Sequence, residues 1–223
     1  MMLIVDRTLY LLSQTLSEIY FKYFSHYSDN NMALISKNTN DRVMIFIDIM
    51  NITKAVEGKT ELRLDPYALA LNLIGPRQMV AGYIFDSRSE DITNNERYLN
   101  QKKFHDKLRY MGFRVIARES FDPQRPEQKE VDVAMACEMV VHAMKNNYDV
   151  AIVVSGDRDF IPAIQHVQAA GKRVEVAAFR DTIGNREAIR RFADEYYELG
   201  EMPVLEMRSP PGAEIGDDGK GME

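Results

Sequence analysis

The sequence has little cysteine and no long hydrophobic run, and both shortages exclude classes of protein. Cys137 is the single cysteine among 223 residues, which excludes an internal disulfide framework and a multi-cysteine zinc site. A reducing compartment, the cytoplasm, is therefore the expected location. No apolar run reaches the roughly eighteen residues that span a bilayer, and the first residues turn polar too early for a secretory signal. We expect no association with a membrane.

Several catalytic motifs are missing as well. The sequence contains neither the GxxxxGK[ST] string of a phosphate-binding P-loop nor the GxGxxG fingerprint of dinucleotide-binding domains. No Ser–His–Asp arrangement is visible, and Cys137 has no evident histidine partner. His105, His142 and His166 fall on separate helix candidates, where we expect structural or surface roles. P-loop enzymes, NAD enzymes and enzymes with a covalent nucleophile are thus disfavoured.

The net charge of −6 argues against a protein that coats nucleic acid by bulk attraction. The charge is unevenly placed, because residues 97–129 hold nine lysines and arginines against four acids, whereas residues 214–223 hold four acids and one lysine. A basic stretch beside an acidic site suits an enzyme that acts on phosphodiesters. A solvated helix face has the same composition, so both interpretations stay open.

The chain divides into three parts. Residues 1–40 are expected to form an amphipathic helical extension and a polar linker, and Met32 offers an alternative start that would leave residues 1–31 upstream of the protein. Residues 41–200 form the main domain. Residues 201–223, rich in glycine and acids, have little to bury and are expected to be disordered.

The main domain alternates short apolar runs with longer helical stretches. Strands are expected at residues 43–48, 79–85, 113–117, 149–155 and 174–179, with a short sixth at 195–199. Helices are expected near residues 65–73, 94–110, 130–146, 159–170 and 186–193. This alternation predicts an α/β fold, a three-layer α/β/α sandwich around a mostly parallel sheet of five or six strands.

Two of the expected strands run directly into acids. VMIFID ends on Asp48, with Asn51 in what we expect to be a following loop, and DVAIVVS leads through Ser155 into Asp157 and Asp159. Ligands of open parallel sheets bind outside the carboxyl ends of the strands. Each aspartate could instead cap a turn or a helix. Crowded carboxylates raise one another's pKa, and a divalent cation would relieve that conflict.

A third acidic group lies on the helix that leads into the fourth strand. Asp132 falls in the expected first turn of this helix, where the helix dipole favours an acid without any further role. Glu138 is six positions later and rotated by about 120° on an ideal helix. We therefore expect Glu138 to support the site, or to belong to a second one, and not to share an ion with Asp132.

The segments FIDIMN, KEVDVAMACEMV, VSGDRDFIPAI, GKRVEVAAF and ADEYYEL together closely resemble the NYN domain of the LabA-like/DUF88 group, which is related to PIN nucleases. The resemblance covers about residues 42–199 and implies a PIN-like fold that binds Mg²⁺ or Mn²⁺ and cleaves RNA. It assigns the family's acids to Asp48, Asp132, Asp157 and Asp159. The family's first asparagine corresponds to Asn51.

The chain departs from the family pattern at three places. Ile49 replaces a frequent glycine after the first aspartate, and Glu138 stands where aspartate is frequent. The serine that often precedes the final helix is not evident near Asn185 and Arg186. These departures leave the metal site intact and put the substrate preference in question.

The sequence thus predicts a divalent-metal-dependent ribonuclease. Asp48, Asp132 and Asp157 would hold one or two Mg²⁺ or Mn²⁺ ions, and Asp159 would complete the site or position the attacking water. Ser155 would support a carboxylate or a phosphate. The residues expected to contact RNA phosphates are Lys102, Lys103, Lys107, Arg109 and Arg158.

Two alternatives to this function stay open. The first is a non-catalytic RNA-binding or regulatory module of the same fold, and the second is a phosphatase or nucleotide hydrolase. Association into a homodimer is left open too.

Overall fold

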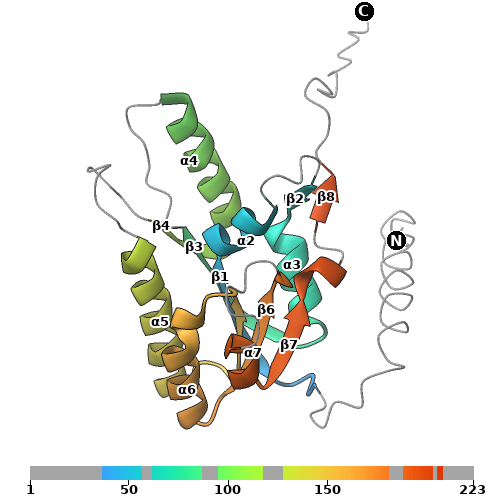
Figure 1. Ribbon diagram of the computed structural model, residues 1–223, viewed down its shortest axis with the longest axis vertical. Coiled ribbons are helices and arrows are strands. Elements are labelled where there is room, and N and C mark those ends of the chain that lie inside the picture. The colour runs from blue at the N-terminus through green and yellow to red at the C-terminus, as the bar shows by residue number, and fades with distance from the viewer. Residues whose placement is uncertain are drawn as a thin grey trace, which may run out of the picture. The chain divides into compact units, whose positions relative to one another are not determined.

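The computed structural model describes residues 37–56, 62–86, 95–117, 128–180, 188–202 and 205–207. Its main sheet consists of strands β1 (Arg42–Asp48), β3 (Gln78–Asp86), β4 (Phe113–Ala117), β5 (Val150–Val154), β6 (Arg173–Ala178) and β7 (Glu195–Glu198). All neighbouring pairs in this sheet are parallel, and the spatial order is β4-β3-β1-β5-β6-β7 (Figure 1). The expected sheet is confirmed, as a six-stranded and fully parallel one.

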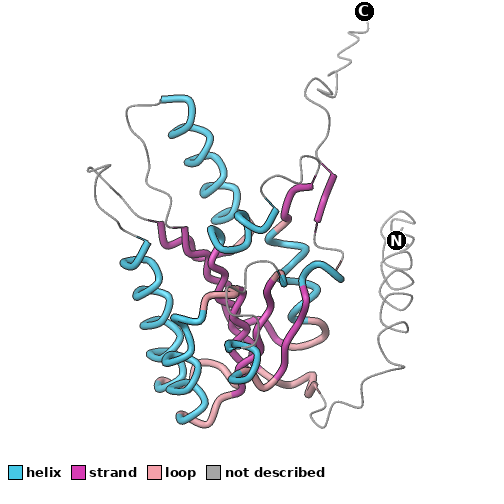
Figure 2. The backbone as a smooth tube through the Cα atoms, in the orientation of Figure 1, coloured by secondary structure: helices cyan, strands magenta, loops and turns pink. Residues whose placement is uncertain are grey.

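Helices cover both faces of the sheet, so the three-layer prediction is confirmed (Figure 2). One face packs against α2 (Ile49–Val56), α3 (Pro66–Ile74) and α4 (Asn95–Tyr110). The other face packs against α5 (Gln128–Met144), α6 (Ile161–Ala169) and α7 (Ala188–Phe192). The short 3-10 helices η1 (Arg158–Phe160) and η3 (Leu199–Glu201) complete the described part of this domain. Every helix in the described ranges is too short or too polar to cross a membrane.

The central strands are apolar throughout because both of their faces are buried. In β1, Val43, Ile45 and Ile47 belong to the core beneath α2 and α3, whereas Met44 and Phe46 belong to the core beneath α5 and α6. All five side chains are at most 1% exposed. Burying a side chain of this size stabilises the folded state by about 1.5–3 kcal/mol, so β1 fixes the centre of the sheet.

Helix α2 differs from the sequence expectation, which placed a loop after Asp48. The strand passes into the helix without a connecting segment, so Asn51 lies on α2. Its sequence IMNITKAV is short and rich in β-branched residues, and it therefore resembles a continuation of the strand. The helix nevertheless forms because Ile49, Ile52 and Val56 are buried on one side of it.

A second, two-stranded antiparallel sheet pairs β2 (Leu62–Leu64) with β8 (Leu205–Met207). The prediction that residues 201–223 are disordered is wrong for β8 and for Glu201, which ends η3. Three apolar or alternating residues are too short a pattern to predict a strand whose partner is distant in the sequence. The expected N-terminal helix and the rest of the acidic tail lie outside the described residues.

Candidate functional site

The strand order reverses beside β1, and this position defines the candidate site. From β1 the chain proceeds outward through β3 and β4 on one side, and through β5, β6 and β7 on the other. In such sheets the ligand crevice lies outside the carboxyl ends of the strands at the reversal. Asp48 ends β1, and Ser155 directly follows β5, so both residues lie at the carboxyl edge of the sheet beside this reversal.

Both carboxylate oxygens of Asp48 are held by hydrogen bonds. Its Oδ1 accepts from the backbone N–H of Asn51 at 3.1 Å, and its Oδ2 accepts from the hydroxyl of Ser155 at 3.2 Å. Asn51 in turn accepts the backbone N–H of Gly156 through its Oδ1 at 2.9 Å. Asp48 therefore caps α2, which is the alternative role considered for it from the sequence. It also joins the ends of β1 and β5.

The second pair of acids begins immediately after this network. The N–H of Asp157 donates to the Oγ of Ser155 at 3.2 Å, and the N–H of Asp159 donates to Oδ1 of Asp157 at 2.9 Å. Asp157 is thus the N-cap of η1, while Asp159 is exposed. One oxygen of Asp157 accepts this capping hydrogen bond, and the other accepts none from the described residues.

Asp132 on α5 is electrostatically coupled to the acid that ends β1 and to the acids that follow β5. Burial first, and then repulsion from Asp48, Asp157 and Asp159, raises its pKa from the ordinary 3.8 to about 6. Helix α5 begins at Gln128, so Asp132 lies in the second turn and not in the first. The helix dipole acts mainly on the first turn, which weakens the interpretation of Asp132 as a dipole-stabilising acid.

Asp48 has its pKa raised chiefly by burial, since only 5% of the residue is exposed. The hydrogen bonds from Asn51 and Ser155 lower that pKa, and repulsion from Asp157 raises it further. The charge of Lys54 on α2 favours the ionised forms of both Asp48 and Asp132. The structure therefore gathers four aspartates and one lysine around one edge of the sheet.

The remaining predicted site residues lie on α5, α4 and η1. Glu138 contacts His142 on the next turn of α5, with Oε2 3.2 Å from Nε2. The four cations of α4 that were expected to bind RNA are exposed, and Arg109 contacts Asp106 at 3.1 Å. These four are Lys102, Lys103, Lys107 and Arg109. Arg158 is exposed on η1, between the two aspartates of that segment.

Sequence reasoning missed two features near the carboxyl edge. Asp86 ends β3 and is fully buried, and its Oδ2 lies 2.9 Å from Nε2 of the buried His105 on α4. Extending the expected strand by one residue would have found Asp86. Lys54 was missed because α2 was expected as a loop. On a helix, its spacing of three from Asn51 places both residues on one side.

The types of side chain at the site fit a hard divalent cation, but their arrangement is not a preformed set of ligands. Carboxylate oxygens are the ligands that Mg²⁺ and Mn²⁺ prefer, and the mutual repulsion acting on Asp132 is what a cation would relieve. In the described part of the chain, no three acidic, histidine or cysteine side chains stand as a finished ligand set. Mg²⁺ retains several waters, so direct contact with one or two carboxylates is sufficient.

A fully parallel six-stranded α/β/α sheet with aspartates at its reversal point is a PIN-like fold of the kind found in nuclease-like domains. The chain belongs to the NYN domain family, whose model matches residues 42–200. The narrower resemblance to the LabA-like group stays a prediction.

Proteins similar to the chain include one from Methanocaldococcus jannaschii and one from Vibrio parahaemolyticus. An uncharacterized protein of Methanocaldococcus jannaschii is 28% identical over 159 residues, which are 68% of this chain and 63% of that protein. The chain therefore spans less than two thirds of this relative. The crystal structure of a protein of unknown function from Vibrio parahaemolyticus superimposes with a TM-score of 0.59 at 20% identity, covering 74% of this chain and 96% of the other. That likeness concerns the fold.

Proposed function

We propose that the chain is a divalent-metal-dependent ribonuclease that hydrolyses RNA phosphodiester bonds. The observation that carries this proposal is the position of Ser155, whose hydroxyl donates to the Asp48 carboxylate and accepts the backbone N–H of Asp157, so that the acids of two strands lie at one edge of the sheet. The repulsion of Asp48, Asp157 and Asp159 on Asp132 agrees with this arrangement. Membership of the NYN family supports a nuclease-like activity. The single cysteine fits a reducing compartment such as the cytoplasm, and a homodimer stays a prediction.

Asp48, Asp132 and Asp157 are the residues that would hold Mg²⁺ or Mn²⁺, directly or through water. When bound, the ion supplies Lewis acidity, which lowers the pKa of water and offsets charge on phosphate oxygens. Asn51 and Ser155 hold the Asp48 carboxylate in a fixed orientation through both of its oxygens. This fixed orientation limits the reorganisation that the site needs on binding.

The exposed residues of the site would contact the RNA and accept a proton from water. Asp159 is exposed and directly follows Arg158, so its carboxylate can accept a proton from water in the crevice. Arg158, together with the cations of α4, would contact phosphates without reading bases. Binding of this kind weakens with salt.

The test is a cleavage assay on the purified chain with single-stranded and structured RNA, in Mn²⁺, Mg²⁺ or EDTA. We expect cleavage in either metal and none in EDTA. Asp48→Asn keeps the shape of the side chain and removes its charge, and it should reduce the rate at least a hundredfold. The matched control is Asp149→Asn at the opposite end of β5, which should cleave as the wild type does.

Three results would contradict the proposal. Metal-independent cleavage would remove the assigned role of the aspartates. Folded protein that binds RNA and metal without cleaving would favour a non-catalytic module. Activity on small phosphate esters and not on RNA would favour a phosphatase or nucleotide hydrolase.

A further inference from the structure

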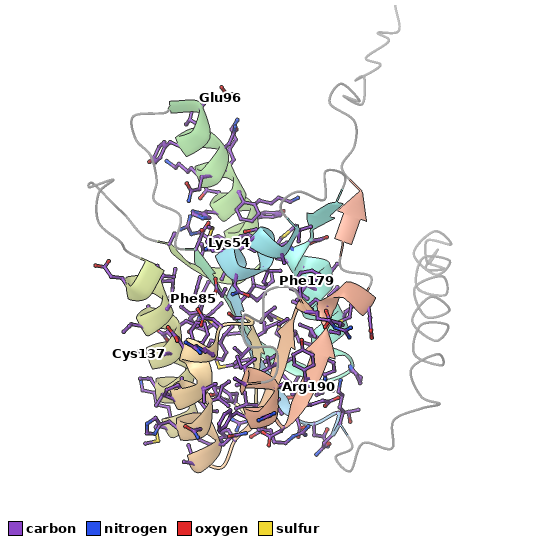
Figure 3. All side chains as sticks on the ribbon, in the orientation of Figure 1. Lys54, Phe85, Glu96, Cys137, Phe179 and Arg190 are labelled. Atoms are coloured by element: carbon purple, nitrogen blue, oxygen red, sulfur yellow. The ribbon has the colours of Figure 1, made fainter. Side chains whose placement is uncertain are left out.

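Lys54 is a cation whose charge acts on Asp48 and Asp132, and it is not among the proposed catalytic residues. It lies in the last turn of α2, the helix that begins directly after Asp48 (Figure 3). Its charge stabilises the ionised forms of two carboxylates on different elements, Asp48 on β1 and Asp132 on α5. These effects agree with the placement of Lys54 on α2, and that placement carries the inference.

The position of Lys54 on α2 gives the same result from geometry. The buried side of the helix consists of Ile49, Ile52 and Val56. Asn51, which bonds Gly156 across the site, lies on another side, and Lys54 follows it by three residues. Residues at this spacing are neighbours on a helix surface, separated by about 4.5 Å along its axis.

Lys54 forms no ion pair with the described acids of the site. Within the described ranges, no carboxylate lies within 4.0 Å of its ammonium group, and the residue is exposed. Arg42 and Lys172, by contrast, lie 2.8 Å and 3.9 Å from Asp149. An exposed lysine that keeps three unused donors beside a crowded anionic site can bind an additional anion.

We propose that Lys54 is a further substrate-contacting residue, whose ammonium group binds a non-bridging oxygen of the phosphate at the reaction centre. This inference rests on the proposed ribonuclease function and adds a residue to it. RNA must bring a negative charge to a site that already holds four aspartates, and the cation on α2 offsets that repulsion at the point of entry. A flexible ammonium suits this contact because it acts as a point charge and needs no fixed bidentate geometry.

A purely structural role for Lys54 would have different consequences from phosphate binding. If the lysine served only to reduce repulsion among the aspartates, its removal would weaken the folded state and leave RNA affinity unchanged once metal had neutralised the acids. If it binds phosphate, its removal weakens RNA binding with metal present. Metal affinity would then stay the same or rise, because a nearby positive charge is lost.

The experiment compares the wild type with Lys54→Gln, Lys54→Arg and Lys145→Gln. Lys145 is an exposed lysine directly after α5, about 20 Å along the helix axis from Asp132, and it controls for loss of a charge elsewhere. Binding of a fluorescein-labelled single-stranded oligoribonucleotide is measured by anisotropy in Ca²⁺ over a series of salt concentrations. Cleavage and Mn²⁺ affinity are measured in parallel, and thermal unfolding confirms that each variant is folded.

For Lys54→Gln we expect the slope of log affinity against log salt to fall by about 0.7, the value for one phosphate contact on a single strand. We also expect a lower kcat, unreduced Mn²⁺ affinity, and partial rescue by Lys54→Arg. Lys145→Gln should match the wild type. Equal RNA affinity, salt slope and kcat in wild type and Lys54→Gln would overturn the assignment, as would loss of Mn²⁺ affinity in Lys54→Gln.

The two proposals fail in distinguishable ways. Wild-type protein that binds RNA through Lys54 without cleaving it contradicts the ribonuclease function alone. Cleavage by Lys54→Gln at the wild-type rate contradicts the role of Lys54 alone. A wild-type chain that neither binds nor cleaves RNA overturns both.

Discussion

The carboxylate of Asp48 accepts a hydrogen bond from the hydroxyl of Ser155, which lies 107 positions later in the chain. Both residues are buried; Asp48 ends β1 and Ser155 directly follows β5, the neighbouring strand at which the strand order reverses. The same hydroxyl oxygen accepts the backbone N–H of Asp157 at 3.2 Å. A single serine therefore connects an acid of β1 to the segment that carries the next two acids.

Ser155→Ala should lower the free energy of unfolding by about 1–3 kcal/mol, because the buried Oδ2 of Asp48 loses its donor. The loss should also weaken Mn²⁺ binding, since the orientation of that carboxylate is no longer fixed. Urea denaturation and metal titration measure the two effects. Thr53→Val removes a hydroxyl that bonds within α2 and is the control. Equal stability of Ser155→Ala and wild type would contradict this prediction.

Asp132→Asn should stabilise the metal-free protein in a pH-dependent way. The pKa of Asp132 is raised to about 6 in the folded chain, so its protonated form contributes stability that is complete below about pH 4 and is lost as the pH rises through 6. The asparagine variant does not lose this contribution. Its advantage in Tm over the wild type should therefore grow between pH 4.5 and 7.5 in EDTA, as measured by calorimetry.

The control for this pH dependence is Asp149→Asn. Arg42 donates hydrogen bonds to Asp149 and lowers its pKa, so the stability contributed by this ion pair is present above about pH 4 and is lost only at lower pH. The difference between Asp149→Asn and wild type should stay constant from pH 4.5 to 7.5. A constant difference for Asp132→Asn as well would show that the pKa of Asp132 is not raised in the folded chain.

Glu175→Gln should lower the free energy of unfolding by about 3–5 kcal/mol, because it leaves the charge of Arg77 buried without full compensation. The two side chains form a pair of hydrogen bonds at 2.6 and 2.9 Å, and both are 0% exposed. Replacing both residues, as Arg77→Met with Glu175→Leu, should cost less than the sum of the single changes. A double-mutant cycle in urea measures this coupling, and additive effects would argue against it.

Gly82→Ala should be destabilising by about 1–3 kcal/mol through overpacking. A Cβ at this position on β3 would lie 2.7 Å from the Phe113 ring on β4 and 2.7 Å from the Met79 methyl group. Combining it with Phe113→Leu should recover part of the loss. Gly200→Ala is the control, because its nearest neighbour is Glu198 Oε1 at 3.5 Å, an ordinary contact. A larger loss in the control, measured by thermal unfolding, would contradict the packing argument.

The sheet was predictable because each of its central strands is a continuous apolar run. VMIFI and VAIVV read as buried strands, and an acid at the end of each points to one edge of a parallel sheet. That pattern alone predicts that Asp48 lies near the SGDRD segment. The resemblance to the NYN family depended on the same segments, and the family match confirms it.

Features that depend on distant partners could not be predicted in this way. Helix α2 and strand β8 are stabilised by burial and by pairing that the local sequence does not specify. Asp86 and His105 are an acid and a base on separate elements, and their pairing depends on how α4 docks. The place of Lys54 beside Asn51 was not predicted because the residues after Asp48 were expected to form a loop. Residues three apart are neighbours on a helix but need not be neighbours in a loop.

The parallel pairing of β1 with β5 has a consequence for biosynthesis. The two strands are joined by about a hundred residues of intervening chain, and contacts of such sequence separation form slowly because a large loop must close first. A nascent chain that ends before β5 carries Asp48 and Asp132 without Ser155 and the η1 aspartates. A ribosome-bound fragment that ends before η1 therefore lacks part of the candidate site.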